Sequence, residues 1–200
     1  MIRIGLTGPT GAGKSTVAAY FSRAGYPVVD ADAAARAVTA ENSPTLAVLA
    51  DAFGADILMA DGTLDRKLLA QRAFASPEQT ARLNGITHPA IIERMEAQLA
   101  QLAAAGEKAA IIDAPLLFEA GMDETCDLTV AVLASEAVRK ARIMARDGID
   151  EAAALRRMKA QPNERFYLER AGNIIYNDAD DTQLQNQLSV LLREIGRWCE

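Results

Sequence analysis

Short apolar runs alternate with longer stretches of helical spacing along this chain. Few polar positions interrupt the runs, so we expect each to form a strand that is buried on both faces. The expected strands are Ile2–Leu6, Pro27–Asp30, Ala109–Asp113, Leu128–Leu133 and Ile174–Tyr176. This order predicts an α/β fold: a five-stranded parallel sheet with helices on both faces.

The intervening stretches carry helix start and stop signals. Ser43, Ser76, Ser135 and Asp150 stand where N-caps are expected, and glycines end several of the patterns. The expected helices are Lys14–Ala24, Ala31–Ala40, Pro44 to Gly54, Leu64–Phe74, one beginning after Ser76, Pro89–Ala105, Ser135 to Arg146, Asp150 to Lys159, Glu164–Ala171 and Thr182–Trp198.

The chain is expected to form a single domain over residues 1–200 with two helical additions. Segment 43–106 is all-helical and longer than a strand-to-strand crossover needs, which predicts an inserted substrate-binding subdomain. The short helices of about 135–171 predict a hinged lid.

Composition limits the class of protein. The 200 residues carry a formal net charge of −6, which argues against non-specific nucleic-acid binding. No apolar stretch approaches the roughly 18–20 residues of a membrane span, and no secretory signal opens the chain. We therefore expect a soluble, cytoplasmic protein without a membrane partner. A monomer is also expected, although composition does not determine the oligomeric state. Its two cysteines, Cys126 and Cys199, are expected to be reduced thiols.

Basic residues gather between Arg139 and Arg170. Most of them are expected on solvated helix faces, but one or two arginines could bind phosphate. His88 is the only histidine, so no His/Cys cluster can build a zinc site. Any metal should be bound by oxygen, which suits Mg²⁺.

The most informative motif is Gly8 to Ser15, which reads Gly-Pro-Thr-Gly-Ala-Gly-Lys-Ser between the first strand and the first helix. It fits the phosphate-binding loop G-x-x-x-x-G-K-[ST] in its proper context. The glycines let backbone N–H groups surround phosphate oxygens, and the helix N-terminus adds a positive dipole. Lys14 can reach the β- and γ-phosphates, and the Ser15 hydroxyl can bind Mg²⁺. The motif predicts binding of a nucleoside triphosphate.

Three carboxylates follow strands and should lie near that loop. Asp30 and Asp32 come after the second strand, where each could act as a base, assist Mg²⁺ or cap a helix. Asp113 ends the third strand, the position of a carboxylate beside the Mg²⁺ of a phosphate loop.

The class of nucleotide-binding protein follows from what accompanies the loop. The Asn-Lys-x-Asp motif of a GTPase is missing, and the D-x-x-G match from Asp51 to Gly54 falls at a helix end. A short chain with helical insertions and an arginine-bearing lid favours a small-molecule kinase.

Several motifs together resemble the dephospho-CoA kinase family over nearly the whole chain. They are Leu6-Thr7-Gly8, Val29-Asp30-Ala31-Asp32, Phe53-Gly54, Asp61 to Arg66, Leu83 to Pro89, Asp113 to Glu119, Arg142-x-x-x-Arg146, Gln161 and Ile175-Tyr176-Asn177. The resemblance implies a P-loop kinase fold and transfer of phosphate from ATP, with Mg²⁺, to the ribose 3′-hydroxyl of dephospho-CoA in the last step of coenzyme A synthesis.

The resemblance also implies roles for matching positions. Asp32 would be the general base, and Lys14 and Arg142 would stabilise the transferring phosphoryl group, Arg142 arriving as the lid closes. The nucleotide would contact Gly11, Ala12, Gly13, Lys14, Ser15, Thr16, Arg146 and Asn177, and the metal would contact Ser15 and Asp113. The acceptor would contact Thr7, Asp32, Arg66, His88, Leu116, Phe118 and Glu119.

Alternatives stay open at five positions. His88 could serve only as a helix residue before Pro89, and Leu117 and Phe118 could equally be core. Arg139 stands where the family often has Gln, which leaves its role undefined. Asp178 follows Asn177 where Gly is common, which weakens the assignment of an adenine loop there.

Overall fold

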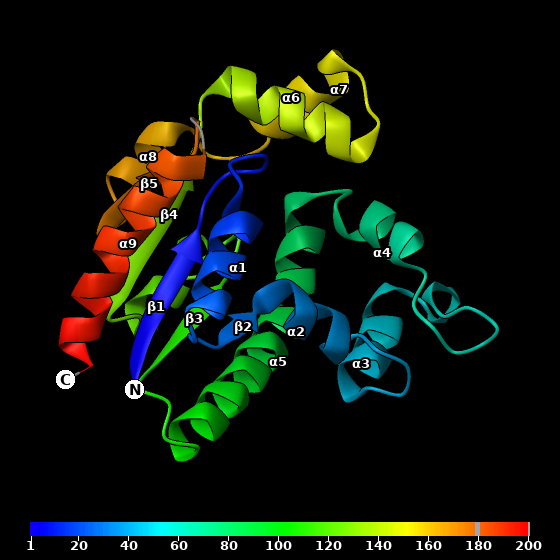
Figure 1. The fold of residues 1–200 in the computed structure, drawn as a ribbon. Coiled ribbons are helices and arrows are strands. Elements are labelled where there is room, and N and C mark those ends of the chain that lie inside the picture. The colour runs from blue at the N-terminus through cyan, green and yellow to red at the C-terminus, as the bar shows by residue number, and fades with distance from the viewer. Residues whose placement is uncertain (179–180, 200) are drawn as a thin grey trace. The chain divides into compact units, whose positions relative to one another are not determined.

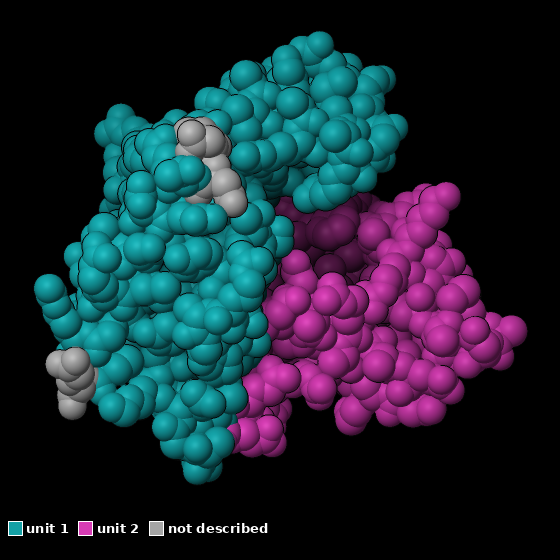
Figure 2. All heavy atoms as spheres, viewed as in Figure 1, with its two compact units in different colours: residues 1–29, 102–200 teal, residues 30–101 magenta. Residues whose placement is uncertain are grey.

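A computed structural model describes residues 1–178 and 181–199. The chain divides into two compact units, which Figure 2 shows in different colours. Unit 1 comprises Met1–Val29 and Leu102–Glu200, and unit 2 comprises Asp30–Gln101. Each unit is described by itself below.

A five-stranded sheet forms the centre of unit 1 (Figure 1). Its strands are β1 (Ile2–Thr7), β2 (Val28–Asp30), β3 (Ala109–Asp113), β4 (Leu128–Leu133) and β5 (Asn173–Tyr176). They lie in the order β2-β3-β1-β4-β5. β1 pairs in parallel with β3 and β4, and β4 pairs in parallel with β5. The five strands expected from the apolar runs are confirmed, and the glycine-rich loop leaves the central one.

Alternate strand residues bury against helices on opposite faces of the sheet. On one face, Ile4, Ile111 and Val132 belong to a core that also contains residues of α1 (Lys14–Arg23) and α9 (Asp181–Trp198). On the other face, Ala131 and Leu133 pack against Tyr167 of α8 (Glu164–Leu168). Helices on both faces explain why the strands read as nearly continuous apolar runs.

The segment expected to form a lid contains α6 (Glu136–Asp147), α7 (Glu151–Lys159) and α8. Buried Ile143, Ala154 and Met158 join α6 to α7. Asp150 caps α7 as expected, its carboxylate accepting the Ala153 N–H at 2.7 Å. Ser135 occupies the N-cap position of α6, but its side chain makes no cap bond. Its backbone N–H instead donates to Asp178 Oδ1 at 2.5 Å.

Unit 2 is helical apart from one isolated bridge between Leu58 and Leu64. Its elements are α2 (Ala31–Val38), α3 (Pro44–Phe53), the 3₁₀ turn η1 (Ala55–Ile57), α4 (Arg66–Ala73) and most of α5 (Pro77–Ala104). Residues of α3, η1, α4 and α5 share a core built around Leu49, Phe53 and Ile57. The Ser43 hydroxyl caps α3 by accepting the Leu46 N–H at 3.1 Å, as the sequence predicts.

The expected division into two helices before and after Pro89 is wrong. α5 is one 28-residue helix with Pro89 inside it. The proline removes one N–H from the helical ladder, which costs about 3 kcal/mol or more. Burial of Met95 and Leu99 beyond it keeps the helix continuous. Of the helices that the structure describes, none combines the length and hydropathy of a bilayer crossing.

Candidate active site

The glycine-rich loop between β1 and α1 leaves backbone donors unused. Gly8, Gly11 and Gly13 have φ values of 147°, 80° and 93°, which favour glycine. Ala12 N–H donates to Pro9 O at 3.1 Å. Within the described chain, the N–H groups of Gly11, Gly13, Lys14 and Ser15 donate to no protein acceptor. Four free donors at a helix N-terminus form a site for an anion such as phosphate.

Lys14 and Asp113 bring opposite charges to this end of the sheet. Lys14 opens α1, Asp113 ends β3, and Lys14 Nζ forms an ion pair with Asp113 Oδ1. Asp113 is 9% exposed, whereas Ser15 and Thr16 are exposed. The structure therefore brings together two groups that the sequence predicts near a triphosphate.

The oxygen donors near the loop suit a Mg²⁺ ion that is bound partly by phosphate and water, rather than a metal bound by protein side chains alone. The described residues contain no group of three or more His, Cys, Asp or Glu side chains that could hold a metal ion. Ser15 Oγ and the Asp113 carboxylate are two hard oxygen donors that could complete a shell of phosphate and water oxygens. Mg²⁺ is usually bound in this way at phosphate-transfer sites.

Side chains from elsewhere in unit 1 donate hydrogen bonds to backbone carbonyls of the loop. Arg139 and Arg142 of α6 donate to its carbonyls, Arg139 Nε to Thr10 O at 2.9 Å and Arg142 Nη1 to Ala12 O at 3.3 Å. Asn177, after β5, donates from Nδ2 to Ala12 O at 2.8 Å. Arg142 and Asn177, both expected at the nucleotide, therefore contact the loop itself.

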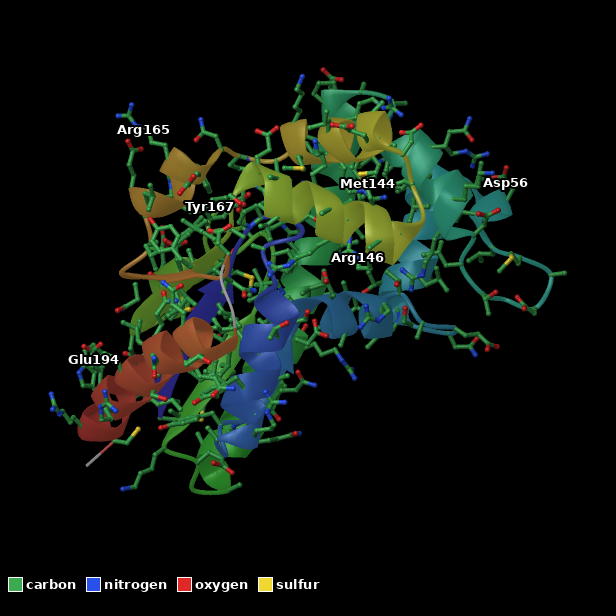
Figure 3. The ribbon with its side chains drawn as sticks, turned by 45° about the horizontal axis from the view of Figure 1, so that its top comes forward. Asp56, Met144, Arg146, Arg165, Tyr167 and Glu194 are labelled. Carbon is green, nitrogen blue, oxygen red and sulfur yellow. The ribbon has the colours of Figure 1, made fainter. Side chains whose placement is uncertain are left out.

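Arg146 lies on the exposed part of α6 (Figure 3). Its Nε and Nη2 donate to the Asp147 carboxylate at 2.8 and 2.9 Å, and Arg157 also donates to it. Bonds from Arg146 and Arg157 lower the pKa of Asp147. Arg146 would have to exchange this carboxylate for a phosphate in order to bind nucleotide.

Asp30, at the end of β2, and Asp32 differ in their bonding. Asp30 caps α2, its Oδ1 accepting the N–H groups of Asp32 and Ala33 at 2.8 and 3.1 Å. It also lies 3.7 Å from Arg36 Nη2. The Asp32 carboxylate is exposed and forms no hydrogen bond or ion pair within the described residues. Asp30 is structural, and Asp32 is available for chemistry.

Unit 2 contains an apolar cavity of about 190 Å³. Its lining residues are Ala35, Thr39, Leu64, Arg66, Leu69, Ala70, Phe74, Leu83, Thr87 and Ile91. Arg66 is exposed, and its Nη2 donates to Thr39 Oγ1 at 3.1 Å. His88 is half-buried on α5 and is not part of the lining. The helical spacing of the sequence did not predict this cavity, because α2, α4 and α5 all contribute to it.

The Pro115–Glu119 segment after β3 has both buried and exposed members. Thr7 is fully buried, and its hydroxyl donates to Pro115 O at 3.2 Å. Leu117 is core, whereas Leu116 is 52% exposed and Glu119 is exposed. Thr7 therefore supports the segment rather than facing solvent.

Phe118 is half-buried and packs in an aromatic cluster, 6.0 Å from Phe166 and 6.5 Å from Tyr167 between ring centroids. Burial raises the pKa of Tyr167 to about 12. Figure 3 labels Tyr167 on α8.

Two contacts of the loop escaped sequence reasoning. Arg139 is 9% exposed and binds Thr10 O, and Gln161 accepts the Thr10 N–H at 2.8 Å. Both residues lie more than 120 positions from Thr10 in the chain. No local pattern encodes such a contact, and only the resemblance drew attention to Gln161.

The sheet order and the loop after the central strand define this chain as a P-loop kinase. Its fold is that of a shikimate kinase from Bacteroides thetaiotaomicron, with a TM-score of 0.54 and 17% identity over 98% of each chain. At this identity the likeness concerns the fold alone.

More specific matches assign the family. The dephospho-CoA kinase family model matches residues 2–183. A dephospho-CoA kinase from Corynebacterium efficiens is 46% identical over 98% of each chain. Two solved structures cover at least 96% of either chain: one from Thermus thermophilus (TM-score 0.83, 35% identity) and a dephospho-CoA kinase from Campylobacter jejuni (0.73, 26%). The chain belongs to the dephospho-CoA kinase family, whose reaction is the ATP-dependent phosphorylation of dephospho-CoA, the final step of coenzyme A synthesis.

Proposed function

We propose that this kinase transfers the γ-phosphoryl group of ATP to the ribose 3′-hydroxyl of dephospho-CoA, with Asp32 as the general base. The observation that carries the proposal is the different bonding of Asp30, at the end of β2, and Asp32. Asp30 is occupied as a helix cap, whereas the Asp32 carboxylate has no bonding partner among the residues that the structure describes.

Asp32 is the general base in this proposal. Its carboxylate accepts the proton of the 3′-hydroxyl while that oxygen bonds to the γ-phosphorus. The bond between the γ-phosphorus and the β–γ bridging oxygen breaks, and ADP leaves with the electron pair. A carboxylate without internal partners keeps its lone pairs for this proton.

The donor side binds and orients ATP. The free N–H groups of Gly11, Gly13, Lys14 and Ser15 bind phosphate oxygens, with Ala12 and Thr16 completing the loop. Lys14 leaves Asp113 to contact the β- and γ-phosphates. Arg142 turns from the loop carbonyls toward the transferring group, and Arg146 supplies a further cation.

We propose Ser15 and Asp113 as the protein ligands of Mg²⁺, which neutralises charge between the β- and γ-phosphates when bound. We propose Arg66, His88, Leu116, Phe118 and Glu119 as residues that bind dephospho-CoA, and Thr7 as a residue that supports the Pro115–Glu119 segment. Segment 43–106 acts as the substrate-binding subdomain and 135–171 as the lid. Cytoplasmic location and a monomeric state remain predictions.

A panel of acceptors tests the proposal. We expect turnover of dephospho-CoA with ATP and Mg²⁺, and ³¹P NMR of the product should show one new phosphomonoester on the ribose 3′ position. AMP, CMP and shikimate are the competing acceptors. Comparable kcat/KM with any of them, or a phosphate at another position, would contradict the proposal.

A further inference from the structure

Three successive carbonyls of the phosphate loop are bound from outside by side chains of unit 1. Thr10 O accepts from Arg139 Nε at 2.9 Å, and Ala12 O accepts from Asn177 Nδ2 at 2.8 Å. Gly11 O, between them, accepts from Arg142 Nη1 at the longer distance of 3.4 Å. The carbonyls of the loop therefore face protein donors.

The direction of these carbonyls determines the direction of the free N–H groups. In a trans peptide the C=O of one residue and the N–H of the next point in opposite directions, and the described chain has no cis peptide. Arg139, by holding Thr10 O, turns the N–H of Gly11 the other way. Asn177, by holding Ala12 O, does the same for the N–H of Gly13. These are two of the four N–H groups left without a protein acceptor.

Both glycines are also covered by the residues that hold the neighbouring carbonyls. A Cβ on Gly13 would lie 2.1 Å from Asn177 Nδ2, and one on Gly11 would lie 2.7 Å from Arg139 O. Arg139 and Asn177 are 9% and 6% exposed. The Asn177 side chain and the Arg139 backbone therefore leave no room for a side chain at these two positions of the loop.

Gln161 adds a third contact at Thr10. Its Oε1 accepts the Thr10 N–H at 2.8 Å while Arg139 binds the carbonyl of the same residue. The peptides on both sides of Thr10 are therefore oriented by side chains from the segment that contains α6 to α8. Arg142 is more loosely held than Arg139, with contacts of 3.3 and 3.4 Å, which suits a residue that leaves the loop during turnover.

We propose that Arg139, Gln161 and Asn177 are positioning residues that hold the phosphate loop in its anion-binding conformation before ATP arrives. The inference rests on the proposed ATP site but assigns these residues a role in loop geometry rather than in contact with ATP. For Asn177 this differs from an adenine contact. For Arg139 it defines a role that the sequence left open.

Tripolyphosphate is the probe that isolates the loop, because it carries the phosphates of ATP without the nucleoside. We expect Arg139→Met and Asn177→Leu, which remove the donors at similar side-chain size, to raise the Kd of ATP and of tripolyphosphate by the same factor. One lost charge-assisted or buried hydrogen bond corresponds to about tenfold. The KM for dephospho-CoA should stay within about twofold, since the acceptor does not depend on these N–H groups.

Lys140→Met is the matched control for Arg139→Met. Lys140 is the next residue on α6, and its Nζ pairs with Glu151 at 2.5 Å, so the substitution removes a cation without touching the loop. Both Kd values should remain unchanged in it. Gln161→Leu removes no charge, and it replaces Arg139→Met as the test if that variant fails to fold. It should raise the Kd of ATP and of tripolyphosphate by about threefold, since one neutral hydrogen bond is lost.

Three results would overturn the inference. Selective loss of ATP affinity in Asn177→Leu, with tripolyphosphate binding intact, would show that Asn177 reads the nucleoside. Unchanged Kd values in folded Arg139→Met or Gln161→Leu would remove these residues from loop positioning. A lower Tm with unchanged Kd values would show a merely structural role. Turnover of dephospho-CoA by the wild-type enzyme is measured separately, so failure of the proposed function is recognisable on its own.

Discussion

At the scale of single residues, position relative to a helix end separates two chemically identical carboxylates. Asp30 lies at the N-cap of α2 and accepts two backbone N–H groups. Asp32 lies in the first turn of the same helix and has no bonding partner among the described residues. An N-cap contributes about 1 kcal/mol to helix stability, whereas a carboxylate without a bonding partner can accept a proton.

We expect Asp32→Asn to lower kcat by at least about 10²-fold, because an amide cannot accept the proton of the 3′-hydroxyl. The Kd of ATP, measured by titration calorimetry, should be unchanged. Asp30→Asn is the matched control, since Asn caps helices about as well as Asp. Equal losses in the two variants, or full activity of Asp32→Asn, would reject Asp32 as the base.

Cys126 offers a prediction about reactivity. Burial, with a smaller effect of the Asp123 charge, raises the pKa of this thiol from 9.0 to about 11. The thiolate is the reactive form, so a shift of two units lowers its fraction near pH 8 about 100-fold. In a Cys199→Ser protein, we expect iodoacetamide to alkylate Cys126 about 100-fold more slowly when the protein is folded than when it is unfolded in guanidinium chloride. Equal rates in the two states would contradict the shift.

At the scale of secondary-structure elements, the sequence predicts most accurately where the pattern is local. All five strands follow from apolar runs, and Ser43 and Asp150 cap the helices expected of them. Pro89 misled the prediction because a proline inside a helix is a local stop signal, which burial of Met95 and Leu99 overrides. Ser135 misled it because the bond at the start of α6 comes from a residue 43 positions away.

That bond makes Asp178 a capping residue for α6. Its Oδ1 accepts the Ser135 N–H at 2.5 Å, and hydrogen bonds from Ser135 lower the pKa of the Asp178 carboxyl. A carboxyl whose pKa is lower in the folded than in the unfolded protein stabilises the fold above its unfolded pKa. This stability is lost as the pH falls through the folded value.

We therefore expect Asp178→Ala to lower the free energy of unfolding by about 1 kcal/mol at pH 7, the usual loss of a cap. The difference from wild type should shrink as the pH falls below about 4, the ordinary pKa of Asp. Asp178→Asn retains an acceptor oxygen without a charge, so its stability relative to Asp178→Ala should not change with pH. Urea denaturation between pH 3 and 7 measures all three proteins. A constant difference between wild type and Asp178→Ala would exclude the charged cap.

At the scale of the whole molecule, the sequence identified the phosphate loop but not the distant residues that bind its carbonyls. Lys14, Ser15 and Asp113 follow from a compact motif and a strand end, and the structure places Lys14 against Asp113. Arg139 and Asn177 reach the loop only through the fold, because α6 and the end of β5 lie against it. The insertion was expected over 43–106, whereas the compact unit covers Asp30–Gln101 and includes the two acids after β2. Unit 2 thus contains both the proposed base and Arg66.

Because Lys14 and Arg66 are proposed to bind different substrates, we predict that the stabilisation of the protein by each substrate can be lost separately. A ligand at 100 times its Kd adds about 2.7 kcal/mol, which raises the Tm of a protein of this size by about 5–10 °C. We expect Lys14→Ala to abolish the shift caused by ATP with Mg²⁺ and to retain the shift caused by dephospho-CoA. Arg66→Ala should do the reverse.

Removing Mg²⁺ with EDTA should reduce the ATP shift alone, because only the phosphates of ATP share the ion with Ser15 and Asp113. Lys67→Ala, which removes an exposed cation beside Arg66, should keep both shifts. Loss of both shifts in Lys14→Ala or in Arg66→Ala, measured by differential scanning fluorimetry, would show that the substrates do not use separate sets of residues.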